Sequence, residues 1–211
     1  MKEIFGTTAI LVAMTAATTA QAQGINGDWY ASVFGGYSFP SSLDNDATDN
    51  YSGYDEVIFF VEQEEGLVLG AAIGLEVSPG LRAEVEISYA SYELGDYGVE
   101  YSPGSPGEET YGDVPGDATA TYLMANVWYD VSDMGGDSYT PYVGGGIGGV
   151  AYDIEDGDDG TALAFQLGVG AQFGAIDVGY RFKMTGELDD IGDGLEPVTS
   201  HNLQVGYVMK F

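Results

Sequence analysis

Hydrophobic and polar residues alternate along the last eleven residues of the chain, from His201 to Phe211. One face carries Leu203, Val205, Tyr207, Met209 and Phe211, and the other carries Asn202, Gln204, Gly206 and Lys210, with Val208 as the exception. A period of two is typical of a β-strand with one apolar face. A tilted strand needs about 9–11 residues to cross a bilayer. We therefore predict a membrane-spanning strand that closes a barrel by pairing with the first strand.

The same alternation recurs upstream and predicts an all-β chain. The predicted strands are 29–39, 66–77, 81–92, 119–131, 139–151, 163–173, 176–184 and 201–211. Long loops at 40–65, 93–117, 152–160 and 185–200 alternate with compact turns. An eight-stranded antiparallel up-and-down transmembrane β-barrel has this pattern, with long loops outside the cell and the termini in the periplasm.

One apolar run, Val57 to Val61, interrupts the first long loop. It either extends the next strand beyond the membrane or caps the mouth of the barrel. We favour the extension.

The N-terminus predicts a secretory signal peptide over residues 1–22. Lys2 supplies a positive charge, an apolar stretch is centred on 10–14, and Ala20-Gln21-Ala22 fits a cleavage site. The barrel would then comprise residues 23–211. The chain has no Cys, which excludes disulfides, thiol catalysis and cysteine metal sites.

The charge is strongly negative, with 34 acidic residues against 5 basic ones. Most of the acidic residues fall in the predicted outer loops. Nucleic acid is not expected as a partner, because binding it requires basic residues that neutralise phosphates. The expected partners are outer-membrane lipids and lipopolysaccharide, the barrel-assembly machinery, and an extracellular molecule that the sequence does not identify.

The few basic residues of the predicted strands fall on the non-apolar faces. A lipid-facing Arg or Lys at mid-membrane costs about 2–4 kcal/mol, so these side chains should point into the lumen. Side chains just fill the interior of an eight-stranded barrel. We predict a lumen charge network of Glu76, Arg82, Glu84, Glu86, Asp177, Arg181 and Lys183, with at most a narrow water path.

The sequence resembles the OmpA-type outer-membrane β-barrel superfamily, in its porin-like and surface-antigen branches. The resemblance is carried by Trp29-Tyr30, Gly36-Tyr37-Ser38-Phe39, Leu81-Arg82-Ala83-Glu84, the segment 123–130, the segment 140–148, Gly179-Tyr180-Arg181-Phe182 and the terminal Phe211. It spans the predicted mature chain and implies the fold and an outer-membrane location. It also implies that Phe211 is the signal read by the assembly machinery. It says little about function.

Five carboxylates in the predicted loop 152–160 form a candidate Ca²⁺ site. They are Asp153, Glu155, Asp156, Asp158 and Asp159. Oxygen-rich loops suit Ca²⁺, but the spacing does not match an EF-hand. Runs of charge are usually solvated surface. A looser alternative is that divalent cations bridge these carboxylates to lipopolysaccharide phosphates. No other cofactor is expected.

Two further motifs give little indication of catalysis. The segment 144–149 fits G-x-G-x-x-G, but an acidic loop follows it where a dinucleotide site needs a helix. His201 adjoins Ser200, yet neighbouring strand residues point to opposite faces. We therefore expect a non-enzymatic structural or surface-interaction protein. A narrow cation-preferring channel is the alternative, and an outer-membrane lipid-modifying enzyme is a third.

Overall fold

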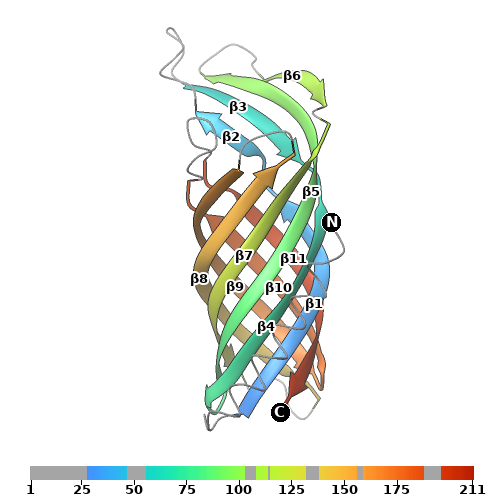
Figure 1. Cartoon of the computed structure of the whole chain (residues 1–211), viewed down its shortest axis with the longest axis vertical. Helices are drawn as coiled ribbons and strands as arrows, with labels where there is room; N and C mark the ends of the chain where they lie inside the picture. The colour runs from blue at the N-terminus through green and yellow to red at the C-terminus, as the bar shows by residue number, and fades with distance from the viewer. Residues whose placement is uncertain are drawn as a thin grey trace.

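A computed structural model describes residues 28–46, 56–102, 108–113, 115–131, 138–155, 159–187 and 196–211. Within this part of the chain the secondary structure consists of β-strands (Figure 1). They are β1 (Asp28–Pro40), β2 (Leu43–Asp46), β3 (Glu56–Gln63), β4 (Gly66–Ser78), β5 (Leu81–Ser102), β6 (Glu108–Asp113), β7 (Asp117–Asp130), β8 (Thr140–Ile154), β9 (Asp159–Phe173), β10 (Ile176–Thr185) and β11 (Thr199–Lys210). In these segments no helix is long and apolar enough to cross a membrane.

Eight strands close into an antiparallel barrel. Its ring order is β1, β4, β5, β7, β8, β9, β10, β11 and back to β1. The closure is made by the first and last barrel strands, which pair from Tyr30 opposite Lys210 to Pro40 opposite Ser200. The predicted eight-stranded up-and-down barrel, including its closing pair, is confirmed.

The barrel has two unlike ends. We call the end with the tight connections at 79–80 and 174–175 the turn end, and the opposite end the apical end. Gly80 and Gly174 adopt φ values of 77° and 62° in these connections. Such left-handed conformations suit glycine, which has no Cβ to clash.

A small additional sheet continues from the apical end, at the top of Figure 1. It consists of β2, β3, β6 and residues 94–102 of β5, and we call it the apical sheet. β3 continues the line of β4 along β5, because Leu67 pairs with Ser91 and Gln63 pairs with Leu94. The run at 57–61 is therefore a separate strand, β3, which follows the direction of β4 along β5.

Some predicted boundaries were wrong at the apical end. The loops 40–65 and 93–117 contain β2, β3, the end of β5 and β6. The acidic loop is also shorter than 152–160, because β8 runs to Ile154 and β9 begins at Asp159. Polar, Gly-rich and Pro-rich composition suggested loops here, but pairing with a neighbouring strand overrides local propensity.

The two faces of the barrel wall differ in polarity. Leu123, Leu163 and Leu167 point outward with 59%, 63% and 65% of their surface exposed. The side chains between them, such as Met124 and Gln166, point inward and are buried. An apolar outer surface of this extent is unsuited to water. It matches the lipid-facing band of a transmembrane barrel.

Candidate functional site

The apical half of the lumen is filled by an apolar cluster. Its members are Leu43, Val68, Ala90, Tyr92, Leu94, Ala118, Ala120, Tyr122, Met124, Val150, Tyr152, Ala164 and Val198. Most come from the barrel strands. Leu43 comes from β2, so the apical sheet contributes a side chain to the same core. Tyr152 and Met124 are 2% and 1% exposed, which indicates tight filling of the barrel.

Hydrogen bonds hold two aromatic members of this cluster in place. The hydroxyls of Tyr92 and Ser38 lie 3.0 Å apart in a buried hydrogen bond. The Tyr152 hydroxyl donates to Oε1 of Gln63, at the end of β3. These bonds satisfy polar atoms that would otherwise be costly to bury. The bond between Tyr152 and Gln63 also ties the lumen core to the apical sheet.

A polar network fills the turn-end half of the lumen, and its centre is a buried ion pair. Lys183 Nζ lies 3.2 Å from Glu86 Oε1, and both side chains are 3% exposed. Lys183 also donates to Ser88 Oγ at 2.7 Å. Asn126 and Gln166 donate to the other carboxylate oxygen of Glu86 at 3.0 and 3.1 Å. A buried carboxylate is therefore surrounded by donors from three other strands, β7, β9 and β10.

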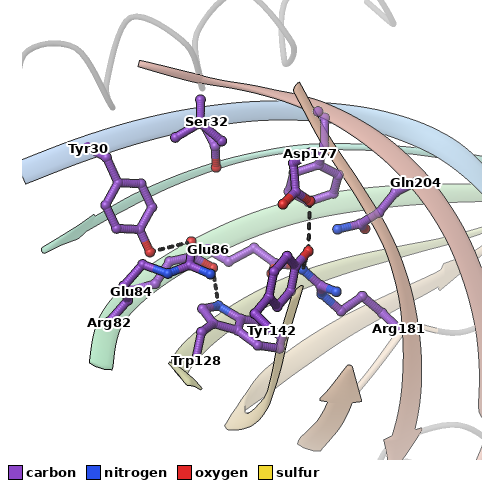
Figure 2. Close-up of a pocket in the computed structure, with 13 residues that line it drawn as sticks. Tyr30, Ser32, Arg82, Glu84, Glu86, Trp128, Tyr142, Asp177, Arg181 and Gln204 are labelled. Carbon is purple, nitrogen blue, oxygen red and sulfur yellow. Dashed lines mark hydrogen bonds between the residues drawn. The ribbon is translucent and has the colours of Figure 1, made fainter. Parts of the chain in front are cut away.

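Glu84 is held differently, by neutral donors. It accepts hydrogen bonds from the Tyr30 hydroxyl at 3.0 Å and from Trp128 Nε1 at 3.0 Å. Asn126 Nδ2 donates to it at 3.1 Å and so links it to Glu86. Figure 2 shows Tyr30, Glu84 and Trp128 converging inside the barrel.

Two arginines flank Tyr142 near the turn end. Arg82 forms an ion pair with Asp130, with Nη2 2.7 Å from Oδ1. Its guanidinium lies 5.0 Å from the centre of the Tyr142 ring. Arg181 donates to the Tyr142 hydroxyl at 2.9 Å, and that hydroxyl donates to Asp177 at 2.7 Å. The Tyr142–Asp177 contact is drawn in Figure 2.

A small cavity lies among these polar groups, with a volume of about 30 Å³. Its walls include Ser32, Arg82, Glu84, Arg181 and Gln204. Arg181 Nε is buried and has no hydrogen-bond partner among the described residues. A volume of this size holds a water molecule, which a polar lining stabilises. The cavity suits solvent and is too small for an organic substrate.

Inward glycines give the large lumen side chains their space. A Cβ on Gly144 would meet the backbone carbonyl oxygen of Val127 and would lie 2.5 Å from the Trp128 ring, and one on Gly168 would lie 2.6 Å from Arg181 Cδ. A Cβ on Gly148 would likewise meet the Leu123 carbonyl oxygen and then Met124. The inward-facing glycines of the run at 144–149 are therefore explained by close packing inside a narrow barrel.

Six of the seven residues predicted for the lumen network make the contacts described above. The exception is Glu76, which accepts a hydrogen bond from the Gly80 backbone at 3.2 Å, in the tight connection at the turn end. Its neighbour across the strand pair, Arg82, bonds to Asp130 instead.

Sequence reasoning missed several residues of the network. They are Tyr30, Ser88, Asn126, Trp128, Asp130, Tyr142 and Gln166. For the three missed residues on β7, the sequence did contain a signal. Asn126, Trp128 and Asp130 fall opposite the apolar residues of that strand, so the same alternation marks them as inward-facing.

Three of the five acidic residues predicted as a candidate Ca²⁺ site lie among the described residues. Asp153 and Asp159 pair across β8 and β9, and Glu155 is exposed beside them. A hydrogen bond between the two carboxyls raises the pKa of Asp153. Asp156 and Asp158 lie outside the described residues. Among the described residues no group of three or more potential ligands is arranged to hold a metal ion.

His201 lies on the outside of the barrel. Its Nδ1 is 2.6 Å from the Tyr180 hydroxyl, and its ring lies 5.3 Å from that of Phe182. Ser200 is inward-facing and 2% exposed. The pair therefore occupies opposite faces of β11, as the alternation predicted.

The sequence decides the family. Residues 8–211 match the family model described as outer membrane protein beta-barrel domain. The chain belongs to this outer-membrane β-barrel family. It is therefore an outer-membrane protein that spans the bilayer with its barrel. No curated protein sequence matches it at a significant level.

Solved structures of outer-membrane barrels are similar in fold. Neisserial surface protein A shares 15% identity, with a TM-score of 0.56, over 88% of this chain and all of that chain. The outer membrane protein AlkL, determined in DMPC bilayers, shares 19% identity, with a TM-score of 0.50, over 88% of this chain and 92% of that chain. Ail of Yersinia pestis shares 17% identity, with a TM-score of 0.42, over 88% of this chain and all of that chain.

Proposed function

We propose that this protein is a non-enzymatic, non-conducting barrel that presents the apical sheet and acidic loops for interactions outside the cell. One observation carries the proposal: the apolar cluster fills the apical half of the lumen. Ions cross a barrel through water, and buried aromatic and aliphatic side chains exclude water from this section.

The orientation is part of the proposal. Outer-membrane barrels of this type have short periplasmic turns and longer extracellular loops. The turn end would then face the periplasm, and the apical sheet would lie outside the cell. This agrees with a signal peptide over residues 1–22 and with Phe211 as the mark for the assembly machinery, both of which stay predictions. Membership of the OmpA-type branch is also a prediction.

The acidic composition of the chain supports an anionic interaction surface at the apical end. The sequence has no Lys or Arg between 83 and 180, or between 184 and 209, whereas carboxylates are frequent there. Lipopolysaccharide phosphates would repel such a surface. Divalent cations that bridge the loop carboxylates to these phosphates would relieve the repulsion. This bridging would be loose, without a preformed cage.

Planar-bilayer conductance tests the proposal. The refolded mature barrel should give no steady current, with or without Ca²⁺. The double variant Tyr122→Ala/Tyr152→Ala should raise ion flux, because it removes two rings from the cluster. Tyr122→Phe/Tyr152→Phe is the matched control and should stay closed. A steady cation-selective current through the wild-type barrel would instead establish the channel alternative.

A lipid-modifying activity is tested separately at His201. The absence of activity in a lipid-hydrolysis assay, with no difference between wild type and His201→Ala, is the expected result. Activity that is lost in the variant would overturn the non-enzymatic assignment.

A further inference from the structure

Two tyrosines form an exposed aromatic pair on the apical sheet. Tyr97 on β5 and Tyr111 on β6 have ring centres 5.8 Å apart, with planes inclined by 32°. Their side chains are 41% and 55% exposed. Both lie beyond Leu94, the point at which β5 leaves the lumen core. The rings therefore lie exposed on the apical sheet, beyond the lumen core.

A β-bulge creates this pair. Gly112 pairs with Tyr97 and Thr110 pairs with Gly98, so Tyr111 is an extra residue on β6. Gly112 has a φ of 119°, a conformation that glycine adopts most readily. Bulges re-aim side chains and bend edge strands. Here the bulge accompanies the approach of the Tyr111 ring to the Tyr97 ring.

The pair is not part of the packed core of the apical sheet. Val57 and Val99 are 0% and 1% exposed and provide buried apolar contacts in the same sheet. Phe59 on β3 pairs with Val99 and is 41% exposed, so it adds a third exposed ring to the same sheet. Large rings left in water at a sheet surface favour contact with a partner.

The negative charge of the segments that carry the rings selects the kind of partner. Exposed carboxylic residues of these segments are Glu62, Glu64, Glu65, Glu93 and Glu100. Glu100, which pairs with Ile58, faces the opposite side of the sheet from Tyr97. The segments 41–65 and 93–117 contain no Lys or Arg. Aromatic faces attract cations through their quadrupole, and the carboxylates concentrate cations from a distance. The aromatic rings and the carboxylates both favour a positively charged ligand.

We propose that Tyr97 and Tyr111 dock a Lys- or Arg-rich segment of a partner protein. This inference rests on the proposed function, because it requires the apical sheet to face outside the cell. A second copy of this chain fits poorly, since its apical sheet carries the same negative charge. The bulge also disrupts the edge of β6, which favours recognition through side chains over strand addition.

Peptide binding to the full mature chain in lipid nanodiscs tests the proposal. The probe is a fluorescent eight-residue oligo-lysine peptide, compared with oligo-glutamate and Gly-Ser peptides of equal length. Oligo-lysine should bind, and the other two should not. Tyr97→Leu and Tyr111→Leu should each lower the association constant roughly two- to fivefold, the loss expected for one exposed cation–π contact.

Matched controls separate the rings from general attraction by charge. Tyr97→Phe and Tyr111→Phe keep an aromatic face and should retain most of the binding. Tyr139→Leu alters another stacked pair, Tyr139 with Phe173, whose centres lie 5.5 Å apart at the turn end. This variant should bind like the wild type. Equal binding by the two apical Leu variants and the wild type would overturn the proposal.

A second measurement needs no variant. Oligo-lysine should shift the ring-proton NMR signals of Tyr97 and Tyr111 and leave those of Tyr139 in place. Unshifted apical rings, or binding by oligo-glutamate, would also overturn the inference. If the rings do not bind oligo-lysine and the bilayer assay shows no conductance, this docking site is ruled out and the proposed function still stands. A steady conductance would remove the proposed function independently.

Discussion

The two halves of the lumen are filled by opposite chemistry within one barrel wall. Tyr122 and Met124 belong to the apolar apical half, and Lys183 and Glu86 belong to the polar half. The halves meet where Lys183 Nζ lies 4.3 Å from the centre of the Tyr122 ring. The alternation of a strand fixes only which side chains point inward. The inner surface can then be apolar or charged, provided that it is packed and its polar atoms have partners.

This difference predicts different responses to mutation. In the polar half, removing one member leaves a charge buried without its partner. In the apical half, removing a side chain leaves a cavity. Barrel stability should therefore be most sensitive at the ion pair, less at the apolar cluster, and least at the exposed apical end.

The largest effect is expected for Lys183→Met. It leaves the Glu86 carboxylate buried without its cation, which should lower the free energy of unfolding by about 3–5 kcal/mol. Urea unfolding in lipid vesicles, followed by circular dichroism, measures this. The double variant Lys183→Met/Glu86→Leu should recover most of the loss, since no unpaired charge remains. A single variant as stable as the wild type would contradict the ion pair.

Met124→Ala should destabilise the apical half by about 2–5 kcal/mol, the usual cost of a large-to-small change in a core. The same unfolding assay applies. Met124→Leu nearly conserves the volume and should cost less than about 1.5 kcal/mol. Equal stability of the Ala and Leu variants would mean that this part of the lumen is not closely packed.

A smaller effect is expected from Gly144→Ala. The added methyl group meets the backbone carbonyl oxygen of Val127 first and the Trp128 ring next, and it should cost at least about 1–3 kcal/mol by overpacking. Gly149→Ala on the same strand is the matched control, because the nearest atom to its Cβ would be Ala162 O at 3.7 Å. In thermal unfolding, Gly144→Ala should lower the melting temperature more than Gly149→Ala does.

The smallest effect is expected at Asp153, where the pKa is raised by the hydrogen bond to Asp159. A raised pKa means that the folded state holds this proton more tightly than the unfolded state. The stabilisation is present at acid pH and is lost as pH rises through the folded-state pKa. Asp153→Asn should therefore stabilise the barrel slightly at neutral pH, by on the order of a few tenths of a kcal/mol, because exposed charges are screened.

The pH dependence of stability checks the direction of this effect. The advantage of Asp153→Asn should shrink as pH falls below the Asp153 pKa. Glu100→Gln, at an exposed position of the apical sheet, serves as the comparison. A variant whose advantage grows at acid pH would contradict the Asp153–Asp159 contact.

The barrel was predictable from sequence because lipid outside and packing inside impose period two on each strand. Residues such as Leu81 to Ser88 show this pattern directly. The apical sheet was less predictable, because its strands lie beyond the closed ring, where the alternation of the barrel strands is not required. Only the run at 57–61 indicated it.

The contacts inside the lumen were only partly predictable. Alternation identifies Lys183 and Glu86 as inward-facing, but β10 and β5 are not neighbours in the ring. Which charges meet across the lumen depends on strand tilt and stagger, which the sequence pattern does not contain. Arg82 instead bonds to a diagonal neighbour on the adjacent strand, because Asp130 lies two residues beyond Trp128, its partner on β7, whereas Glu76 is opposite it on β4.

The filled apical lumen can be tested directly by cysteine labelling, because the chain has no Cys of its own. Val150 is in the apolar cluster, and Asp153, three residues further along β8, is exposed at the apical end. A hydrophilic thiol reagent should modify Asp153→Cys rapidly in the folded barrel and should leave Val150→Cys unmodified. Modification of Val150→Cys as fast as Asp153→Cys would mean that water reaches this depth and would contradict the account.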